Sequence, residues 1–149
     1  MLKKYLLAFI LTVFSLTAFA SAPTTANNEE IQKTMQSWAD ALSSGDPQKI
    51  VNLYDKNAFL YATFKNVLDT PEEKLAYFKG LMQHPNLKVT FKTKNIRTYH
   101  QIAISSGLYN FSYDNQGKKR TVPARYTFVY SHEPTGWLIV EHHSSVLPE

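Results

Sequence analysis

The sequence predicts an α+β domain, in which helices pack on one face of an antiparallel β-sheet. Apolar residues recur at helical spacing as far as His84-Pro85, and from Leu87 onward they alternate with polar residues. Helices first and a run of strands afterwards are typical of this class. Turn sequences at 114–117 and 133–136 separate the later strands, as in a meander of hairpins.

The first twenty residues have the pattern of a signal peptide. Lys3 and Lys4 precede an apolar run at residues 5–14, and Ala18-Phe19-Ala20 is a small-x-small cleavage sequence. The apolar run is shorter than the roughly twenty residues that a membrane-spanning helix needs. We therefore expect export to the periplasm or the medium, cleavage after Ala20, and no membrane attachment of the mature chain.

The composition indicates one domain. The chain has 149 residues, and cleavage would leave 129, enough for a hydrophobic core. We interpret residues 21–27 as a disordered leader and 28–149 as a single domain. Of 16 basic residues, 14 remain without Lys3 and Lys4, against 12 acidic ones, and they are scattered, so no nucleic-acid partner is expected. The chain has no cysteine, which excludes thiolate chemistry and zinc–thiolate sites.

Three helices are predicted in the first part of the domain. The first runs from about Asn28 to Ser43, with an apolar stripe of Ile31, Met35, Trp38 and Leu42. A short second helix starts at Asp46 and Pro47, which suit the N-cap and the first helical position. Thr70 to Glu73 form a capping box before a third helix, whose expected buried residues are Leu75, Phe78, Leu81 and Met82.

A short strand is expected at 58–62, and four more near 87–92, 96–113, 118–131 and 136–145. If tight turns join the last strands, Ser105 lies opposite Tyr126, and Tyr126 lies opposite Glu141. A one-residue bulge, expected at Gly107 or Pro123, would exchange the two faces of the sheet.

Strand alternation in this register gives one aromatic face, which we expect to pack against the helices. Its members are Tyr109, Phe111, Tyr126, Phe128, Tyr130, Trp137, Ile139, Glu141 and His143. Apolar walls with a few convergent polar groups are typical of a small-molecule site. The expected ligand-binding residues are Tyr126, His143, Glu141, Tyr109, Trp38, Tyr54 and Arg125. The alternative for Trp38 and Tyr54 is a place in the core.

The opposite face is aliphatic, and we expect it to form a homodimer interface, because monomers seldom expose so large an apolar patch. The predicted interface residues are Ile102, Ile104, Thr127, Val129, Leu138, Val140 and His142. Arg125 is placed here too, unless a bulge after Pro123 turns it into the pocket to clamp an anion.

His143 and Glu141 are the candidate catalytic pair, if the protein is an enzyme. On one face, the carboxylate could orient the imidazole for proton abstraction beside a carbonyl or for loss of water. The alternative for His143 is a partly buried structural histidine. Adjacent residues of a strand face opposite sides, so His142 and His143 are a poor metal pair. No metal site and no cofactor are expected, since no phosphate loop, nucleophile motif or dinucleotide fingerprint is present.

The C-terminal pattern resembles a known family. Thr127-Phe-Val-Tyr130, Trp137, Val140, His143, Ser145 and Pro148 carry the likeness, supported upstream by Gly45-Asp46 and Leu53-Tyr54. The chain resembles the nuclear transport factor 2-like (NTF2-like, SnoaL-like) superfamily, and within it the association domain of calcium/calmodulin-dependent protein kinase II and its secreted bacterial relatives.

The resemblance implies a cone-shaped fold, a pocket between sheet and helices, and dimers or larger rings. It implies no single activity, because the superfamily includes isomerases, dehydratases, cyclases, binding modules and scaffolds. An arginine of the kinase-type pocket is replaced here by Phe128. We predict an exported domain that binds a small organic molecule. The alternatives are a cofactor-free isomerase, dehydratase or cyclase, and an oligomerisation domain without turnover.

Overall fold

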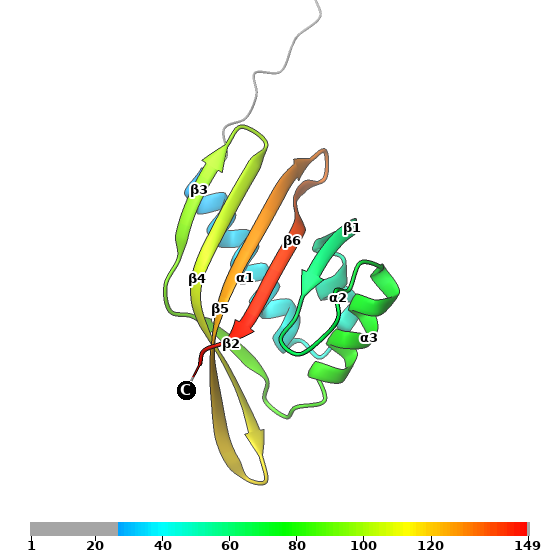
Figure 1. Cartoon of the computed structure of the whole chain (residues 1–149), viewed down its shortest axis with the longest axis vertical. Helices are drawn as coiled ribbons and strands as arrows, with labels where there is room; N and C mark the ends of the chain where they lie inside the picture. The colour runs from blue at the N-terminus through cyan, green and yellow to red at the C-terminus, as the bar shows by residue number, and fades with distance from the viewer. Residues whose placement is uncertain (1–26, 149) are drawn as a thin grey trace, which may run out of the picture.

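The computed structural model describes residues 27–148, which form helices on one side of a curved, mixed, six-stranded sheet (Figure 1). The predicted signal peptide, and the leader up to residue 26, lie outside the described residues. The elements in chain order are α1 (Asn28–Ser43), α2 (Pro47–Val51), β1 (Tyr54–Tyr61), α3 (Pro71–Leu81), β2 (Lys88–Phe91), β3 (Asn95–Tyr99), β4 (Ile102–Asn115), β5 (Lys118–Glu133) and β6 (Gly136–Val146).

The α+β class is confirmed, but the sheet is not wholly antiparallel as predicted. The strand order is β1-β6-β5-β4-β2, and β1 pairs with β6 in parallel. The chain therefore crosses, by way of α3, from β1 at one edge of the sheet to β2 at the other, and the β4–β5 and β5–β6 hairpins then bring it back beside β1. β1 also separates α2 from α3, so the helices do not all precede the strands.

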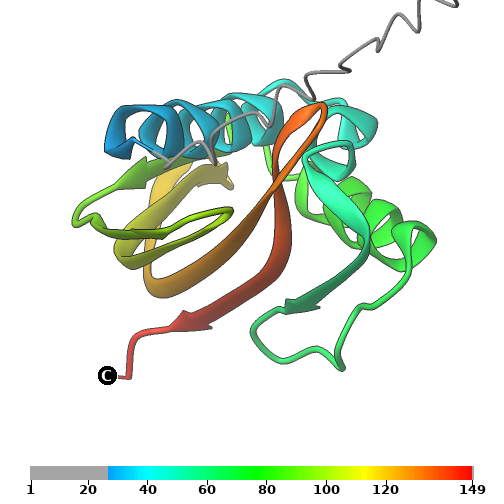
Figure 2. The same ribbon diagram turned by 90° about the horizontal axis from the view of Figure 1, so that it is seen from above.

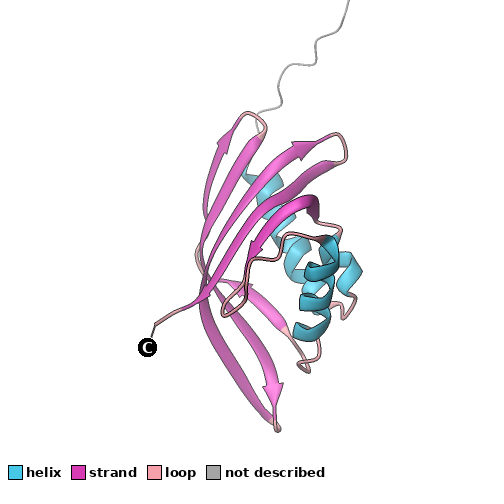
Figure 3. Cartoon of the chain, turned by 45° about the vertical axis from the view of Figure 1, so that its right-hand side comes forward, coloured by secondary structure: helices cyan, strands magenta, loops and turns pink. Residues whose placement is uncertain are grey.

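The helices lie in the hollow of the curved sheet, and its other face is left uncovered (Figures 2 and 3). The long β4–β5 hairpin continues past the body of the domain (Figure 1). The core between the layers is built from aromatic and aliphatic side chains, among them Trp38, Phe78, Tyr109, Phe128 and Tyr130. We call the helix-covered side of the sheet the inner face and the uncovered side the outer face.

Local sequence sets the helix starts as predicted. The Asp46 side chain accepts a hydrogen bond from the Gln48 N–H at the start of α2, and Thr70 and Glu73 form the full capping box of α3. The expected buried stripe of α3 is wrong in part, because Lys74 and Phe78 are its fully buried residues. The Lys74 ammonium donates to the Ala58 carbonyl, 2.6 Å away, and so ties α3 to β1.

The β4–β5 turn is displaced by one residue toward the C-terminus from its predicted position. Asn115 and Lys118 flank it, where Asp114 and Gly117 were expected to do so. Gln116 and Gly117 are its two central residues, with φ of 51° and 73°, as a two-residue type I′ turn requires. Ser105 consequently pairs with Phe128 rather than Tyr126. The partner of each β4 residue thus changes by two positions along β5. Because this is an even number, the side chains of both strands keep their predicted faces.

A one-residue bulge in β6 does change the faces. Tyr130 pairs with Ile139, but its neighbour Val129 pairs with Glu141, so Val140 is an extra residue in β6. Beyond the bulge the burial pattern is inverted from the one predicted. His142 is buried, whereas Glu141 and His143 are exposed on the outer face. The bulge expected at Gly107 or Pro123 does not occur, since the β4–β5 pairing is continuous there.

Gly107 lies where the edge of the sheet divides. β3 pairs with the first part of β4 and β2 with the later part, and between them Thr93 folds against Gly107. Lys92 and Thr93 both donate backbone hydrogen bonds to the Leu108 carbonyl, and the Leu108 N–H donates to the Thr93 hydroxyl. A Cβ on residue 107 would lie 2.2 Å from the Thr93 carbonyl oxygen, so only glycine fits.

We predict that Gly107→Ala destabilises the domain by about 3 kcal/mol, because backbone must shift to admit the methyl group. Urea denaturation of both variants measures this. Gly80→Ala in α3 is the matched control, since its Cβ would meet nothing within 4 Å and alanine favours a helix. An unchanged stability of Gly107→Ala would show that the edge is not packed as described.

Candidate functional site

His142 lies at the centre of a buried polar cluster between β6 and α1. Its ring stacks on Phe128, with ring centroids 4.1 Å apart, and meets the edge of Trp38 at 5.4 Å. Only 2% of the residue is exposed. The predicted position of His142 on the outer face is wrong, and the bulge at Val140 is the reason.

A chain of hydrogen bonds runs through this ring from α1 to the end of β6. The Trp38 indole N–H donates to the Tyr54 hydroxyl at 3.0 Å, and that hydroxyl lies 2.8 Å from His142 Nδ1. His142 Nε2 is 3.5 Å from the Tyr109 hydroxyl, which donates to Ser144 Oγ at 2.6 Å. Indole is only a donor, so the Tyr54 hydroxyl accepts a hydrogen bond from Trp38 and donates its own proton to His142 Nδ1. We therefore assign the Nε2–H tautomer to His142, which leaves each group of the chain with a partner.

Burial keeps this cluster neutral. Loss of water around the ring, assisted slightly by His143, lowers the pKa of His142 to about 3. Burial likewise raises the pKa of the Tyr54 and Tyr109 hydroxyls well above their ordinary value. His142 therefore does not change its charge near neutral pH, and its place in the chain is that of a structural histidine.

The chain ends at a cavity between α3 and the inner face of the sheet. The cavity has a volume of about 190 Å³, and the Ser144 side of β6 forms one of its walls. Its other walls are mostly apolar or aromatic: Tyr77, Leu81, Leu87, Phe111, Tyr113, Val122, Ala124 and Val146, with Thr63 and His84 at the edge. Ser144 accepts from Tyr109, and the described contacts leave its own hydroxyl proton free to turn toward the cavity.

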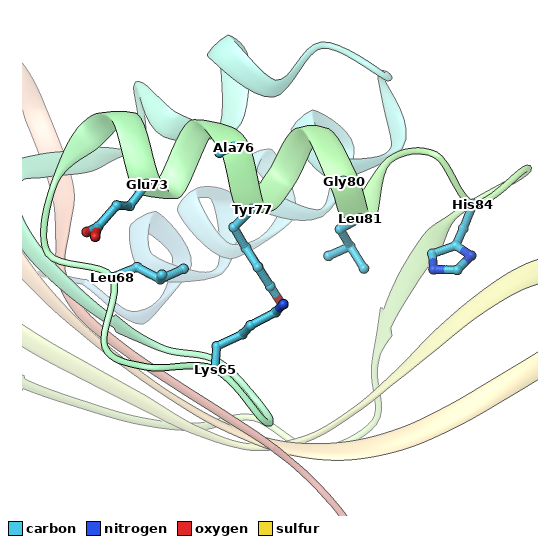
Figure 4. Close-up of a pocket in the computed structure, with 8 residues that line it drawn as sticks. All are labelled: Lys65, Leu68, Glu73, Ala76, Tyr77, Gly80, Leu81 and His84. Carbon is cyan, nitrogen blue, oxygen red and sulfur yellow. The ribbon is translucent and has the colours of Figure 1, made fainter.

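A more open groove of about 550 Å³ adjoins this cavity along α3. Tyr77, Leu81 and His84 line both spaces. Lys65 and Glu73 line the groove but not the cavity. In Figure 4 the side chains of Tyr77 and Lys65 point toward one another, while Glu73 points toward the start of α3. The groove is thus the approach to the cavity.

The structure separates the predicted ligand-binding residues into two groups. Trp38, Tyr54, Tyr109 and Tyr126 are buried on the inner side. Tyr126 donates to the Thr93 carbonyl at 2.9 Å and belongs to the core. Four of the seven predicted residues therefore face inward, but none of these four lines the cavity.

The other three lie on the outer face. Glu141, His143 and Arg125 are exposed, and Arg125 pairs with Ser145 across β5 and β6. The expected placement of Glu141 and His143 in the inner pocket is wrong, because the extra residue Val140 rotates both outward. Arg125 lies with His143 beside outer-face grooves and does not reach the cavity.

Most predicted interface residues do lie on the outer face. Ile102, Ile104, Thr127, Val129, Leu138 and Val140 are exposed or half-buried. His142 is the exception, since it is buried within the chain and offers no surface to a partner.

The residues that line the cavity were not among those predicted from the sequence. Tyr77 and Leu81 are four residues apart on α3, a helical spacing that is visible in the sequence, and His84 lies three residues beyond the end of the helix. Phe111 lies on the face predicted for it, and Tyr113 and Val122 continue its alternation along the hairpin. The sequence does not indicate that α3 and the β4–β5 hairpin line the same cavity.

Within residues 27–148, no three His, Asp or Glu side chains gather closely enough to hold a metal ion. No helix in the same range is both long and apolar enough to cross a bilayer.

Helices in the hollow of a curved mixed sheet, with a cavity between the layers, define a domain of the NTF2-like fold. The family model of the calcium/calmodulin dependent protein kinase II association domain matches residues 27–148. The chain belongs to this family.

Solved structures agree with this assignment. A Xanthomonas campestris protein named for the same association domain is 33% identical, with a TM-score of 0.78 over 92% of this chain and 99% of that one. Two others share the fold at low identity. An NTF2-like protein from Novosphingobium aromaticivorans is 14% identical (TM-score 0.71, 80% of each chain), and a ketosteroid isomerase-like protein from Erwinia carotovora is 13% identical (TM-score 0.70, 81% and 96%). A comparison with curated proteins found no significant match.

We predict that Tyr54→Phe destabilises the domain by about 3 kcal/mol, because it leaves the Trp38 N–H and His142 Nδ1 buried without a partner. Urea denaturation at neutral pH measures the change. Tyr61→Phe is the control, since 43% of Tyr61 is exposed and its loss of a hydroxyl should cost less than about 0.5 kcal/mol. Equal losses in both variants would contradict the hydrogen-bonded chain.

Proposed function

We propose that this domain binds a small organic molecule in the cavity between α3 and the sheet. The observation that carries the proposal is the cavity itself, which has mostly apolar walls and a small number of hydroxyls, those of Thr63, Tyr77, Tyr113 and Ser144. Such a combination is the usual form of a small-molecule site. A cavity of roughly 150 Å³ admits a benzene ring, so this one has room for a single ring or a short chain.

Binding without turnover has better support than an enzyme that uses the predicted acid–base pair. Glu141 and His143 are exposed on the outer face, on the opposite side of the sheet from the cavity. His142 occupies the inner position, but its pKa is lowered to about 3 and its ring nitrogens both have partners in the cluster. Neither arrangement gives a base that faces a molecule in the cavity.

We predict that Val122→Phe abolishes binding, because the larger ring fills the cavity next to Phe111. Screening a library of fluorinated one-ring compounds by ¹⁹F NMR tests this, and the screen does not require the natural ligand. Thr121→Phe is the matched control, since it adds the same ring to the next residue, which is exposed. Binders that keep their affinity in Val122→Phe would show that the cavity is not the site.

We also propose that the outer face forms a homodimer interface. Ile102 and Tyr99 are 38% and 54% exposed, and the half-buried Ile104, Val129 and Leu138 lie beside them on the same face. Contiguous apolar surface of this kind marks interaction sites. Membership of a family named for association supports the proposal.

Light scattering of the mature protein should give the mass of a dimer, and Val129→Lys should give that of a monomer, because a desolvated ammonium opposes association. Gln48→Lys, on the exposed surface of α2, is the control and should remain a dimer. A monomeric wild-type protein at micromolar concentration would contradict the proposal.

We propose further that the protein is exported, on the evidence of the positive, apolar and small-residue segments of residues 1–20. Expression in a bacterial host should yield a periplasmic chain that begins at Ser21. An uncleaved cytoplasmic chain would overturn this.

A further inference from the structure

We infer that the molecule bound in the cavity is a small organic carboxylate, with its apolar part inside and its anionic end at Lys65 and His84. This inference rests on the proposed function, and it adds the chemical class of the ligand.

The loop between β1 and α3 is held so that Lys65 faces the approach to the cavity. The Thr63 hydroxyl donates to the Ser144 carbonyl and accepts from the Val146 N–H, which fastens the loop to β6. Phe64 follows in the left-handed region, with φ of 58°, and 95% of the residue is exposed. A bulky residue with positive φ is strained, and such strain gathers at functional sites. The strained turn sends the Phe64 ring into solvent and leaves Lys65 directed at Tyr77 (Figure 4).

The positive charge of Lys65 is not neutralised by the protein. The one ion pair among residues 27–148 joins Lys33 to Glu29 on α1. Glu73 lines the same groove, but its carboxylate accepts from the Asp69 and Thr70 N–H groups in the capping box, and these bonds lower its pKa. The carboxylate is thus held at the start of α3, where the helix dipole also stabilises it, and it leaves Lys65 for another anion.

His84 supplies a second donor further along the same groove, beyond Leu81 from Lys65 (Figure 4). Its ring packs on Tyr113, with centroids 4.3 Å apart, and lines both the groove and the cavity. The imidazole N–H and the Tyr77 hydroxyl can each donate a hydrogen bond, and together with the Lys65 ammonium they suit the two oxygens of a carboxylate. A phosphate would need more hydrogen-bond donors than these three. Phosphates often bind at the N-terminus of a helix, but the N-terminus of α3 is occupied by the capping box of Thr70 and Glu73.

The apolar part of the ligand is limited to about one ring. The cavity that Tyr77 and Leu81 line has a volume of about 190 Å³, and the buried residues Ala124 and Ser144 are among its walls. Phenylacetate therefore matches the inferred class, with its ring between Leu81 and Val122 and its carboxylate toward Lys65. The neutral amide 2-phenylacetamide has nearly the same shape and serves as the matched probe.

The test is an NMR titration of both probes against the full mature protein, followed by the signals of Leu81, Ala124 and Ser144. Phenylacetate should bind at least tenfold more tightly than 2-phenylacetamide at low salt, and Lys65→Met should remove most of this difference. Lys56→Met, an exposed lysine of β1 that lines neither space, should keep it. Methionine retains the apolar stem of lysine, so the two variants differ from wild type mainly in charge.

The failure of this inference is distinct from the failure of the proposed function. If both probes bind wild type equally, or if Lys65→Met keeps the preference, the carboxylate inference is wrong while the cavity remains a binding site. If neither probe shifts the cavity signals and the fluorinated one-ring compounds also do not bind, the proposed function fails and this inference fails with it.

Discussion

The extra residue Val140 in β6 is the constraint on which the rest of the structure depends. Side chains of a strand alternate between faces, so one inserted residue reverses every position that follows. Before the bulge Ile139 faces the core, and after it His142 and Ser144 do. The bulge thus determines which histidine is inside the protein and which lies in solvent.

Burial of His142 has a cost that the surrounding groups offset. A buried ring nitrogen without a partner would cost about 1–3 kcal/mol, and the hydroxyls of Tyr54 and Tyr109 remove that penalty. The hydrogen-bonded chain also joins α1, β1, β4 and β6, which are distant in sequence. Because its last member, Ser144, lines the cavity, the cluster also positions one wall of that cavity.

Local signals in the sequence predicted the elements well, because caps, turns and apolar periodicity act over a few residues. The capping box of α3 and the start of α2 are examples. The parallel pairing of β1 with β6 could not be predicted, since it depends on contacts between distant segments. The predicted faces of β4 and β5 are correct although the predicted register is wrong by two residues. The single extra residue Val140, in contrast, reverses the predicted faces of Glu141 and His143. No residue type marks that bulge, so the candidate pair was assigned to the wrong side.

The central claim is that His142 is buried and neutral while His143 faces solvent. Long-range ¹H–¹⁵N NMR of the imidazole rings between pH 8 and pH 4 tests it directly, because nitrogen shifts report both tautomer and protonation. The structure predicts that the His142 ring keeps one protonated nitrogen, Nε2, throughout this range. A His142 ring that becomes doubly protonated near pH 6 would contradict the bulge at Val140 and the buried cluster that depends on it.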